Sequence, residues 1–445
     1  MAHRFFLRLS ALALAISSAA HGADLLEVYD KARVSDPQLA AAEAASLSLK
    51  QGVPLARSAL LPQVNASYTK SRSGFEGTTF SEELNRDVTF TTTSRNGNLG
   101  VNVQQSIYDH SNYMDLRAAR AQAERGNADY DAANDALVIR VAEAYFGVLT
   151  AQTNLTSAEA EEKAVGRQLE QADQRFEVGL TAITDVHEAR ARYDGARAAV
   201  ILARNALDDA FEAVIELTGE IIETIAPLKP EIELAKPVPD EVERWVETAI
   251  ANNPSLKAAQ KSVEAAGHVT KSAWAGHLPT LGLGGNYSQQ STGGDVGPFQ
   301  TRDPKSDSLS LVLNVPIFSG GATNARYRQS IYDRDAAADR AEQLRRSIVR
   351  QTRGAFRGVA AGISEVEARA QALVSAKSAL EATEAGFEVG TRTIVDVLLS
   401  QQQLFAAERE SARARHNYIL ATLRLKQAAG TIDIADLRAV NAMLE

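Results

Sequence analysis

The chain has 445 residues, of which 45% are hydrophobic and 23% are charged, and it contains no cysteine. This composition excludes a disordered chain, a collagen-like chain and a disulfide scaffold. The formal net charge is -9, from 47 basic and 56 acidic residues, so the protein has no basic field for binding nucleic acid and we expect no nucleic-acid partner.

The N-terminus has the pattern of a secretory signal peptide. Arg4 and Arg8 precede an apolar run from Leu9 to Ala20, and small residues follow up to Gly22. This charge, length and cleavage chemistry predicts a signal peptide over residues 1–22. The apolar run is shorter than the ~20 residues that cross a bilayer as a helix, so we do not expect it to remain as an anchor. The mature protein is therefore expected to be exported.

The rest of the sequence contains two copies of one pattern. Asp36-Pro37-Gln38-Leu39 is matched by Asn253-Pro254-Ser255-Leu256, and Phe176-Glu177-Val178-Gly179 is matched by Phe387-Glu388-Val389-Gly390. Other matched blocks occur in the same order and at nearly the same separation, which indicates a tandem duplication.

The duplication predicts how the chain is divided. We expect a first repeat over residues 23–226 and a second repeat over residues 241–434. Residues 227–240 contain four prolines and are expected to form the connector. Residues 435–445 are left as a C-terminal tail.

Each repeat is expected to contain very long helices. No proline occurs between Pro62 and Pro227, or after Pro316, and apolar residues recur at every seventh position within these tracts. If Asn112–Val178 is one helix, its length is about 100 Å at ~1.5 Å per residue, which indicates a rod. By itself this pattern also fits a solvated coiled-coil rod without a channel.

Each repeat also contains one run in which apolar residues alternate strictly with smaller or polar residues, and a second run in which this alternation is weaker. The strong runs are 99–108 and 309–318, and the weaker runs are 63–71 and 280–290. Period two with one apolar face predicts strands, and about ten residues are enough to cross a bilayer in a barrel.

These runs predict one β-hairpin in each repeat, over about residues 63–108 and 280–318. The segments Gly74–Asn98 and Ser291–Ser308 are rich in Thr, Ser, Gly, Asn and Asp, so we expect them to be long exterior loops. The smallest membrane barrels use ~8 strands, so two hairpins cannot close one and several chains must share the wall. A soluble, half-buried sheet is the alternative for the strands taken alone.

The turns after the long helices resemble those of a known family. The runs Arg175 to Val186 (RFEVGLTAITDV) and Gly386 to Val397 (GFEVGTRTIVDV) resemble the TolC outer-membrane efflux protein family. The same resemblance is carried by Leu61-Pro62, His277-Leu278-Pro279, Ala144-Tyr145-Phe146 and Val315-Pro316-Ile317-Phe318-Ser319-Gly320-Gly321. It covers nearly the whole chain after the signal peptide.

The resemblance implies a fold that is mainly α with β. Tandem-duplicated coiled-coil helices would form an α-barrel in the periplasm, and four membrane strands per chain would complete a 12-stranded β-barrel, about the size that encloses a pore, in a homotrimer. The implied location is the outer membrane of a Gram-negative bacterium. The implied function is an exit duct for tripartite drug efflux or type I protein secretion, with outer-membrane lipid, a periplasmic adaptor protein and an inner-membrane RND or ABC transporter as partners.

The two turns have their own local signals. Gly179 and Gly390 follow long helices and predict left-handed helix ends. Thr393 lies three residues before Asp396, which predicts a capping box. The resemblance places these turns, with Thr181 and Thr393, at the periplasmic tips of the helices.

The resemblance also implies a gate at these tips. Asp185, Thr184 and Arg392 would form links that close the entrance, and Asp396 would lie in an acidic ring at the constriction. An exposed ion pair contributes about 0.2–1 kcal/mol, so three copies could bias a gate that adaptor docking reverses.

Two positions depart from the family pattern. Phe387 stands where a tyrosine is common, and it cannot donate a hydroxyl proton to Asp185. Leu399 stands where a second acidic residue can extend the ring, which argues against cation binding there.

The sequence shows no enzyme signature. It has no G-x-S-x-G, H-E-x-x-H or G-x-x-x-x-G-K motif, and its seven histidines include no i,i+4 pair, so we expect no catalytic residue, no metal site and no cofactor. The competing interpretation is a periplasmic or secreted coiled-coil structural protein.

Overall fold

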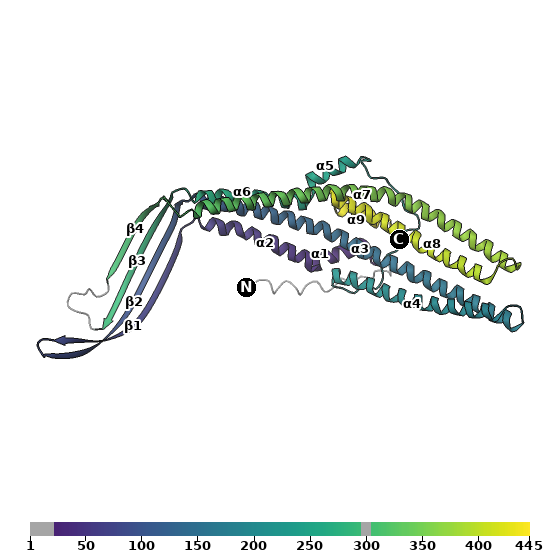
Figure 1. Ribbon diagram of the computed structural model, residues 1–445, viewed down its shortest axis with the longest axis horizontal. Coiled ribbons are helices and arrows are strands. Elements are labelled where there is room, and N and C mark those ends of the chain that lie inside the picture. The colour runs from purple at the N-terminus through teal and green to yellow at the C-terminus, as the bar shows by residue number, and fades with distance from the viewer. Residues whose placement is uncertain (1–21, 295–303) are drawn as a thin grey trace, which may run out of the picture. The chain divides into compact units, whose positions relative to one another are not determined.

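The computed structural model describes residues 22–294 and 304–445 (Figure 1). All of the predicted signal peptide except Gly22 lies outside the described residues, as does the middle of the expected loop Ser291–Ser308. The chain forms two compact units. The first comprises the chain up to Ala42 with Tyr130–Pro254 and Arg345–Glu445, and the second comprises Glu43–Asp129 and Ser255–Leu344. Each repeat therefore contributes to both units.

Helices account for most of the described chain. They are α1 (Leu25–Ser35), α2 (Pro37–Ser58), α3 (His110–Glu177), α4 (Ile183–Thr218), α5 (Val242–Asn252), α6 (Pro254–Ala275), α7 (Ala322–Glu388), α8 (Ile394–Ala429) and α9 (Ile434–Asn441). Among the described residues, no helix combines the length and the apolar character needed to cross a membrane.

The two longest helices follow the sequence prediction closely. The helix expected over Asn112–Val178 is α3, with 68 residues, and its counterpart α7 has 67 residues. Each runs without a proline and stops before a glycine in the left-handed conformation, Gly179 or Gly390. The predicted stops are confirmed.

The core of the first unit surrounds the middle of α3. Tyr145 and Phe146 are completely buried there, and the Tyr145 hydroxyl donates to the carbonyl of Ala226 (2.8 Å). Because Ala226 belongs to the segment after α4, this bond ties the start of the connector to the core. Two residues further on, Leu228 forms an antiparallel β-bridge with Leu444 near the end of the chain.

A histidine is buried in the same core. His416 on α8 is only 4% exposed, and its Nδ1 lies 2.8 Å from the Thr150 hydroxyl on α3. The Thr150 hydroxyl donates its only hydrogen to the carbonyl of Phe146 (2.7 Å). The His416 Nδ1 therefore carries a hydrogen and donates it to the Thr150 oxygen. Burial lowers the pKa of His416 to about 4, which keeps the imidazole neutral.

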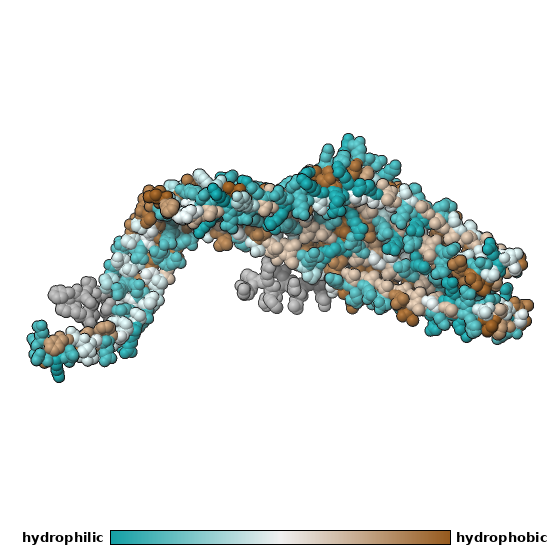
Figure 2. Space-filling model, viewed as in Figure 1, coloured by the Kyte–Doolittle hydropathy of each residue, from teal (hydrophilic) through white to brown (hydrophobic). Residues whose placement is uncertain are grey.

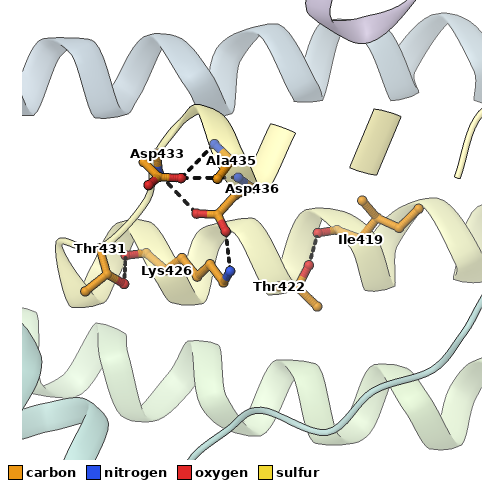
Figure 3. A network of polar contacts seen from close by, with 7 residues as sticks. All are labelled: Ile419, Thr422, Lys426, Thr431, Asp433, Ala435 and Asp436. Carbon is orange, nitrogen blue, oxygen red and sulfur yellow. Dashed lines mark hydrogen bonds and ion pairs between the residues drawn. The ribbon is translucent and has the colours of Figure 1, made fainter. Parts of the chain in front are cut away.

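The C-terminal residues fold back onto α8 (Figure 3). Asp433 caps α9 by accepting from the backbone of Ala435 (2.7 Å) and Asp436 (3.3 Å), and Asp436 accepts in return from the backbone of Asp433 (3.0 Å). The Asp436 carboxylate also pairs with Lys426 on α8. Residues 435–445, expected as a tail, are thus held by a capped helix and an ion pair.

The helices of the second unit pack closely. A Cβ atom on Gly126 of α3 would lie 2.9 Å from Leu49 Cδ1 and 3.3 Å from Ser46 Cα, so a side chain there would require Leu49 and α2 to shift. On α6, Lys261 pairs with Glu124 of α3 at 2.5 Å.

The strands form one antiparallel sheet in the order β1-β2-β3-β4 (Figure 1). They are β1 (Gln63–Ser81), β2 (Arg86–Tyr108), β3 (Thr280–Gly294) and β4 (Lys305–Asn314). The expected hairpin in each repeat is confirmed, and the two hairpins join through β2 and β3. The outer edges of β1 and β4 have no partner strand among the described residues.

Both expected loops are shorter than predicted. In Ser291–Ser308, the residues up to Gly294 belong to β3 and those from Lys305 on belong to β4. The segment Gly74–Asn98 is not a loop, because β1 and β2 pair through it as far as Ser81 and Arg86. Its threonines and phenylalanines favour strands, and this propensity outweighs the polar composition that suggested a loop. Since the described pairing of β2 with β3 begins at Ser94, residues 74–93 pair only with each other in the part of the chain that the structure describes.

The strand register sorts side chains onto two faces. Tyr68 lies opposite Leu99, and Leu283 lies opposite Leu311. Both pairs belong to one apolar face of the sheet. Much of that face is exposed: Leu309 by 79%, for example. The alternate residues line a hollow of about 540 Å³, and they are mainly uncharged polar side chains and glycines, among them Asn102, Gln104, Ser106, Gly284, Asn286, Ser308 and Ser310. The predicted alternation is confirmed over residues 99–108 and 309–314, but residues 315–318, also expected in the strand, lie beyond the end of β4.

Candidate functional site

Two tight turns end the helical hairpins of the first unit (Figure 1). The α3–α4 turn contains Gly179 at φ 76°, and the α7–α8 turn contains Gly390 at φ 78°. In each, the glycine N–H donates to the carbonyl three residues back, at 2.9 Å in the first and 3.1 Å in the second. A side chain at either position would strain the backbone, so glycine is required for both reversals.

Apolar side chains are exposed at these turns. Val178 is 70% exposed, Leu180 77% and Val389 74%. Figure 2 shows apolar residues gathered at this end of the hairpins. An exposed apolar patch of this kind on a surface otherwise rich in polar side chains marks a contact surface.

The start of α8 is tightly capped. The Asp396 carboxylate accepts from the backbone N–H and from the hydroxyl of Thr393, both at 2.9 Å, and the Asp396 N–H donates to the Thr393 hydroxyl at 3.3 Å. These bonds, with the positive charge of Arg392 nearby, lower the pKa of Asp396. The predicted capping box is confirmed.

The start of α4 is built differently. Its N-cap is Ala182, whose side chain makes no capping bond. The Asp185 carboxylate instead accepts from the hydroxyls of Thr181 and Thr184, the latter at 3.5 Å. Asp185 is therefore satisfied within its own hairpin, and Thr181 and Thr184 are brought to it as neighbours.

The structure does not bring Arg392 to Asp185. Among the described residues, no hydrogen bond or ion pair joins them. The positive charge of Arg392 acts instead on Asp396, the carboxylate on its own hairpin. Arg392 packs over Gly386, where a Cβ atom would come within 2.8 Å of its Cγ. Leu399, in the next turn of α8, is 46% exposed.

Phe387 is involved in a contact that the sequence did not indicate. The guanidinium of Arg175, on the last turn of α3, lies over the Phe387 ring with its Cζ 4.5 Å from the ring centroid. In the sequence, Arg175 stands within the family motif as a cation in the last turn of a helix, a position where the helix dipole already favours a positive charge. The signal that could have found it is the missing hydroxyl at Phe387, which leaves the ring face available.

An apolar cluster lies beneath this contact. Val165 of α3 is buried against Ile394 and Leu398 of α8, with Tyr193 and Phe387 packed around them. A mainly polar cavity of about 590 Å³ opens beside it, lined by Gln168, Gln171, Gln174, Arg175, Val178, Glu384, Phe387, Glu388 and Val397. The two hairpins are thus joined by a small apolar core next to a polar cavity.

The described residues hold no group of three or more His, Cys, Asp or Glu side chains arranged to bind a metal ion. The chemistry of the turns is confined to hydrogen bonds, charge and ring contacts. Such contacts can hold two helix ends together or let them separate.

Known proteins match this chain over almost its full length. The model of the family described as "Outer membrane efflux protein" matches residues 28–220 and 245–431. The outer membrane protein TolC of Vibrio cholerae is 39% identical over 433 residues, covering 97% of this chain and 96% of the relative. The alkaline protease secretion protein AprF of Pseudomonas aeruginosa is 30% identical over 426 residues, covering 94% of this chain and 86% of the relative.

A solved structure shows the same fold. The outer membrane channel CmeC of Campylobacter jejuni superposes with a TM-score of 0.77 at 16% identity, covering 98% of this chain and 95% of that chain. The two family matches fall one on each repeat, on either side of the connector. The chain is therefore a member of the outer membrane efflux protein family.

Proposed function

We propose that three copies of this chain form a channel through the outer membrane, the exit duct of a tripartite drug efflux or type I protein secretion system. The observation that carries this proposal is the open sheet. Its apolar face is exposed, and both β1 and β4 have backbone groups without a partner strand among the described residues. In lipid each unpaired backbone group costs several kcal/mol, so the sheet must close with other copies.

The strand lengths suit this closure. β4 has 10 residues, enough to cross a bilayer in a tilted barrel, and the 19-residue β1 offers a longer edge for β4 of the next copy. Two copies would give ~8 strands around a filled interior, whereas three would give ~12 strands and an open pore. The uncharged polar face would then line the pore, and the apolar face, with Leu309 and Leu311, would contact lipid.

The long helices would extend this pore into the periplasm. The heptad spacing of α3, α4, α7 and α8 suits a shared helical wall, and the two turns would stand at its far end. There Arg392 of one copy would reach Asp185 and Thr184 of the next, and the Asp396 residues would form a ring. Leu399, beside that ring, supplies no second carboxylate for a bound cation.

Partners would act at this gate. A periplasmic adaptor could bind the exposed apolar side chains Val178, Leu180 and Val389, and an inner-membrane RND or ABC transporter would supply the cargo. The name of the relative AprF concerns protease secretion, and the name of the TolC relative concerns the outer membrane alone, so both classes of cargo belong to the proposal. No catalytic activity, cofactor or metal is part of it.

The test combines assembly, location and conduction. Cross-linking of the purified protein in detergent should give a species of three chains, cell fractionation should place it in the outer membrane, and reconstitution into planar bilayers should give discrete channels of small conductance. A single-chain species that appears in periplasmic extract without detergent and gives no channels would favour the coiled-coil structural protein instead.

A further inference from the structure

The closed gate needs a link between the two hairpins of one chain, and the polar residues at the turns do not provide it. Asp185 is bound by Thr181 and Thr184 within the first hairpin. Asp396 is bound by Thr393 within the second. Among the described residues, the hydrogen bonds of these two carboxylates thus stay inside their own hairpins.

Phe387 removes one obvious way to connect the hairpins. A tyrosine there could donate its hydroxyl to a carboxylate across the gap, but phenylalanine has no donor. What phenylalanine keeps is the electron-rich face of its ring, which attracts a cation. The neighbouring hairpin supplies that cation: the Arg175 Cζ lies 4.5 Å from the ring centroid.

The position of this contact is as informative as its chemistry. Arg175 is two residues before the end of α3, and Phe387 is one residue before the end of α7. Other polar contacts between the hairpins lie further from the turns, such as Arg192 with Gln402 (3.4 Å) and Arg409 with Glu161 (3.5 Å). Arg175 therefore makes the outermost polar or ring contact between the two hairpins in the described chain.

Arg175 stacks on the Phe387 ring although two carboxylates lie nearby. Glu384 and Glu388 line the same cavity as Arg175, yet no ion pair among the described residues joins Arg175 to either. The ring itself is fixed, because Phe387 packs on the apolar cluster around Val165. A planar guanidinium stacks well on such a ring while its N–H groups face the polar cavity that Arg175 lines.

We propose that Arg175 is a positioning residue of the gate: its guanidinium, stacked on Phe387, latches the α3–α4 hairpin to the α7–α8 hairpin in the closed state. This inference rests on the proposed function, since it presupposes a gate at the turns. The latch acts within one chain, in contrast to the link between chains assigned to Arg392. Opening must separate the arginine from the ring and expose the apolar cluster.

The experiment is a double-mutant cycle read as closed-state conductance in planar bilayers. Arg175→Gln removes the charge, Phe387→Leu removes the ring, and the double variant removes both. Arg167→Gln is the matched control, because it removes an exposed cation two turns earlier on the same helix. Arg175→Lys tests the chemistry, because an ammonium also binds a ring face. Unchanged thermal unfolding of each variant in detergent shows that the fold is intact.

We expect each single variant to raise the ratio of open to closed gate about 2- to 5-fold per chain, the range of an exposed cation–π contact. The double variant should show no further rise, Arg175→Lys should retain part of the closure, and Arg167→Gln should behave as the parent. If Arg175→Gln has the same effect whether position 387 is phenylalanine or leucine, the proposed latch is refuted. It is also refuted if the single variants leave the conductance unchanged. If the parent protein itself forms no channel, the proposed function fails first, and the latch fails with it.

Discussion

The buried carboxylate of Asp36 offers a sharp test of what holds the first unit together. Asp36 lies between α1 and α2 and is 4% exposed. Its Oδ2 accepts from the backbone of Leu39 at 2.8 Å, which caps α2, and its two oxygens accept from Arg140 of α3 at 3.0 and 2.6 Å. This side chain thus joins α2 to α3, and we consider Asp36→Ala and Asp36→Asn.

The expected loss follows from these contacts. Removing one member of a buried ion pair costs about 3–5 kcal/mol, and the Arg140 side chain, which is 27% exposed, places this pair at the low end. Loss of the cap adds about 1 kcal/mol. We therefore expect Asp36→Ala to lower the free energy of unfolding by about 4 kcal/mol. Asparagine caps as well as aspartate and can still accept from Arg140, so Asp36→Asn should cost about 2 kcal/mol.

The same pair predicts a dependence on pH. The hydrogen bonds from Arg140 lower the pKa of Asp36 below its ordinary value of 3.8. The stability that the carboxylate contributes is therefore complete above pH 3.8 and is lost as the pH falls through the lowered pKa. Because a protonated Asp36 resembles asparagine, the difference between the parent and Asp36→Asn should be constant near neutral pH and should vanish in strong acid.

The assay is loss of the helical circular dichroism signal on heating in detergent, at one scan rate. For a unit of roughly 250 residues, 1 kcal/mol shifts the midpoint by about 2 °C, so we expect about 8 °C for Asp36→Ala and 4 °C for Asp36→Asn. Glu143→Gln is the control, because Glu143 pairs with Arg424 at 2.8 Å in an exposed position where a pair contributes little. If Asp36→Ala shifts the midpoint no more than this control, the reasoning from burial is refuted.

Three further predictions concern single ionisable groups. Arg392→Ser should loosen the closed gate and raise the single-channel conductance, and an unchanged conductance would remove Arg392 from the gate. The pKa of His416 is lowered to about 4, so the parent should lose about 1 kcal/mol of stability for each pH unit from 6.5 down to 4, and His416→Gln should abolish that loss in thermal unfolding measured over this range. Burial, with Asp131 nearby, raises the pKa of Asp135 to about 6, so the fold pays for its ionisation as the pH rises from 3.8 to 6. Asp135→Asn should therefore stabilise the protein by about 1 kcal/mol at pH 7, after discounting for residual exposure, and by nothing below pH 3.8; equal midpoints at pH 7 would contradict this.

The long helices could be predicted from the sequence because their signals are local and repeated. The absence of proline and the heptad spacing placed α3 within two residues of its observed start, and Gly179 marked its end. That the segment Gly74–Asn98 forms strands could not be predicted in this way. Its polar composition suggested a loop, whereas its pairing depends on threonine and phenylalanine side chains from two strands that stabilise each other only when they are adjacent.

In the candidate site, too, local features could be predicted from the sequence and contacts between distant residues could not. The capping of α8 by Thr393 and Asp396 follows from a spacing of three residues and was predictable. The stacking of Arg175 on Phe387 joins two repeats that are far apart in the chain, so no window of sequence contains both partners. It became visible only when packing brought the ends of α3 and α7 together.

The two turns show how a duplicated sequence can give a gate with unequal halves. Alignment of the repeats sets Ala182 against Thr393 and Asp185 against Asp396. In the second hairpin, threonine and aspartate fix the start of α8 with a capping box, which stabilises a helix end by about 1 kcal/mol. In the first hairpin, alanine cannot cap, so the start of α4 lacks this restraint and Asp185 holds only neighbouring hydroxyls. Motion at the gate should therefore begin at α4, and introducing the missing cap with Ala182→Thr should shift the gate toward its closed state.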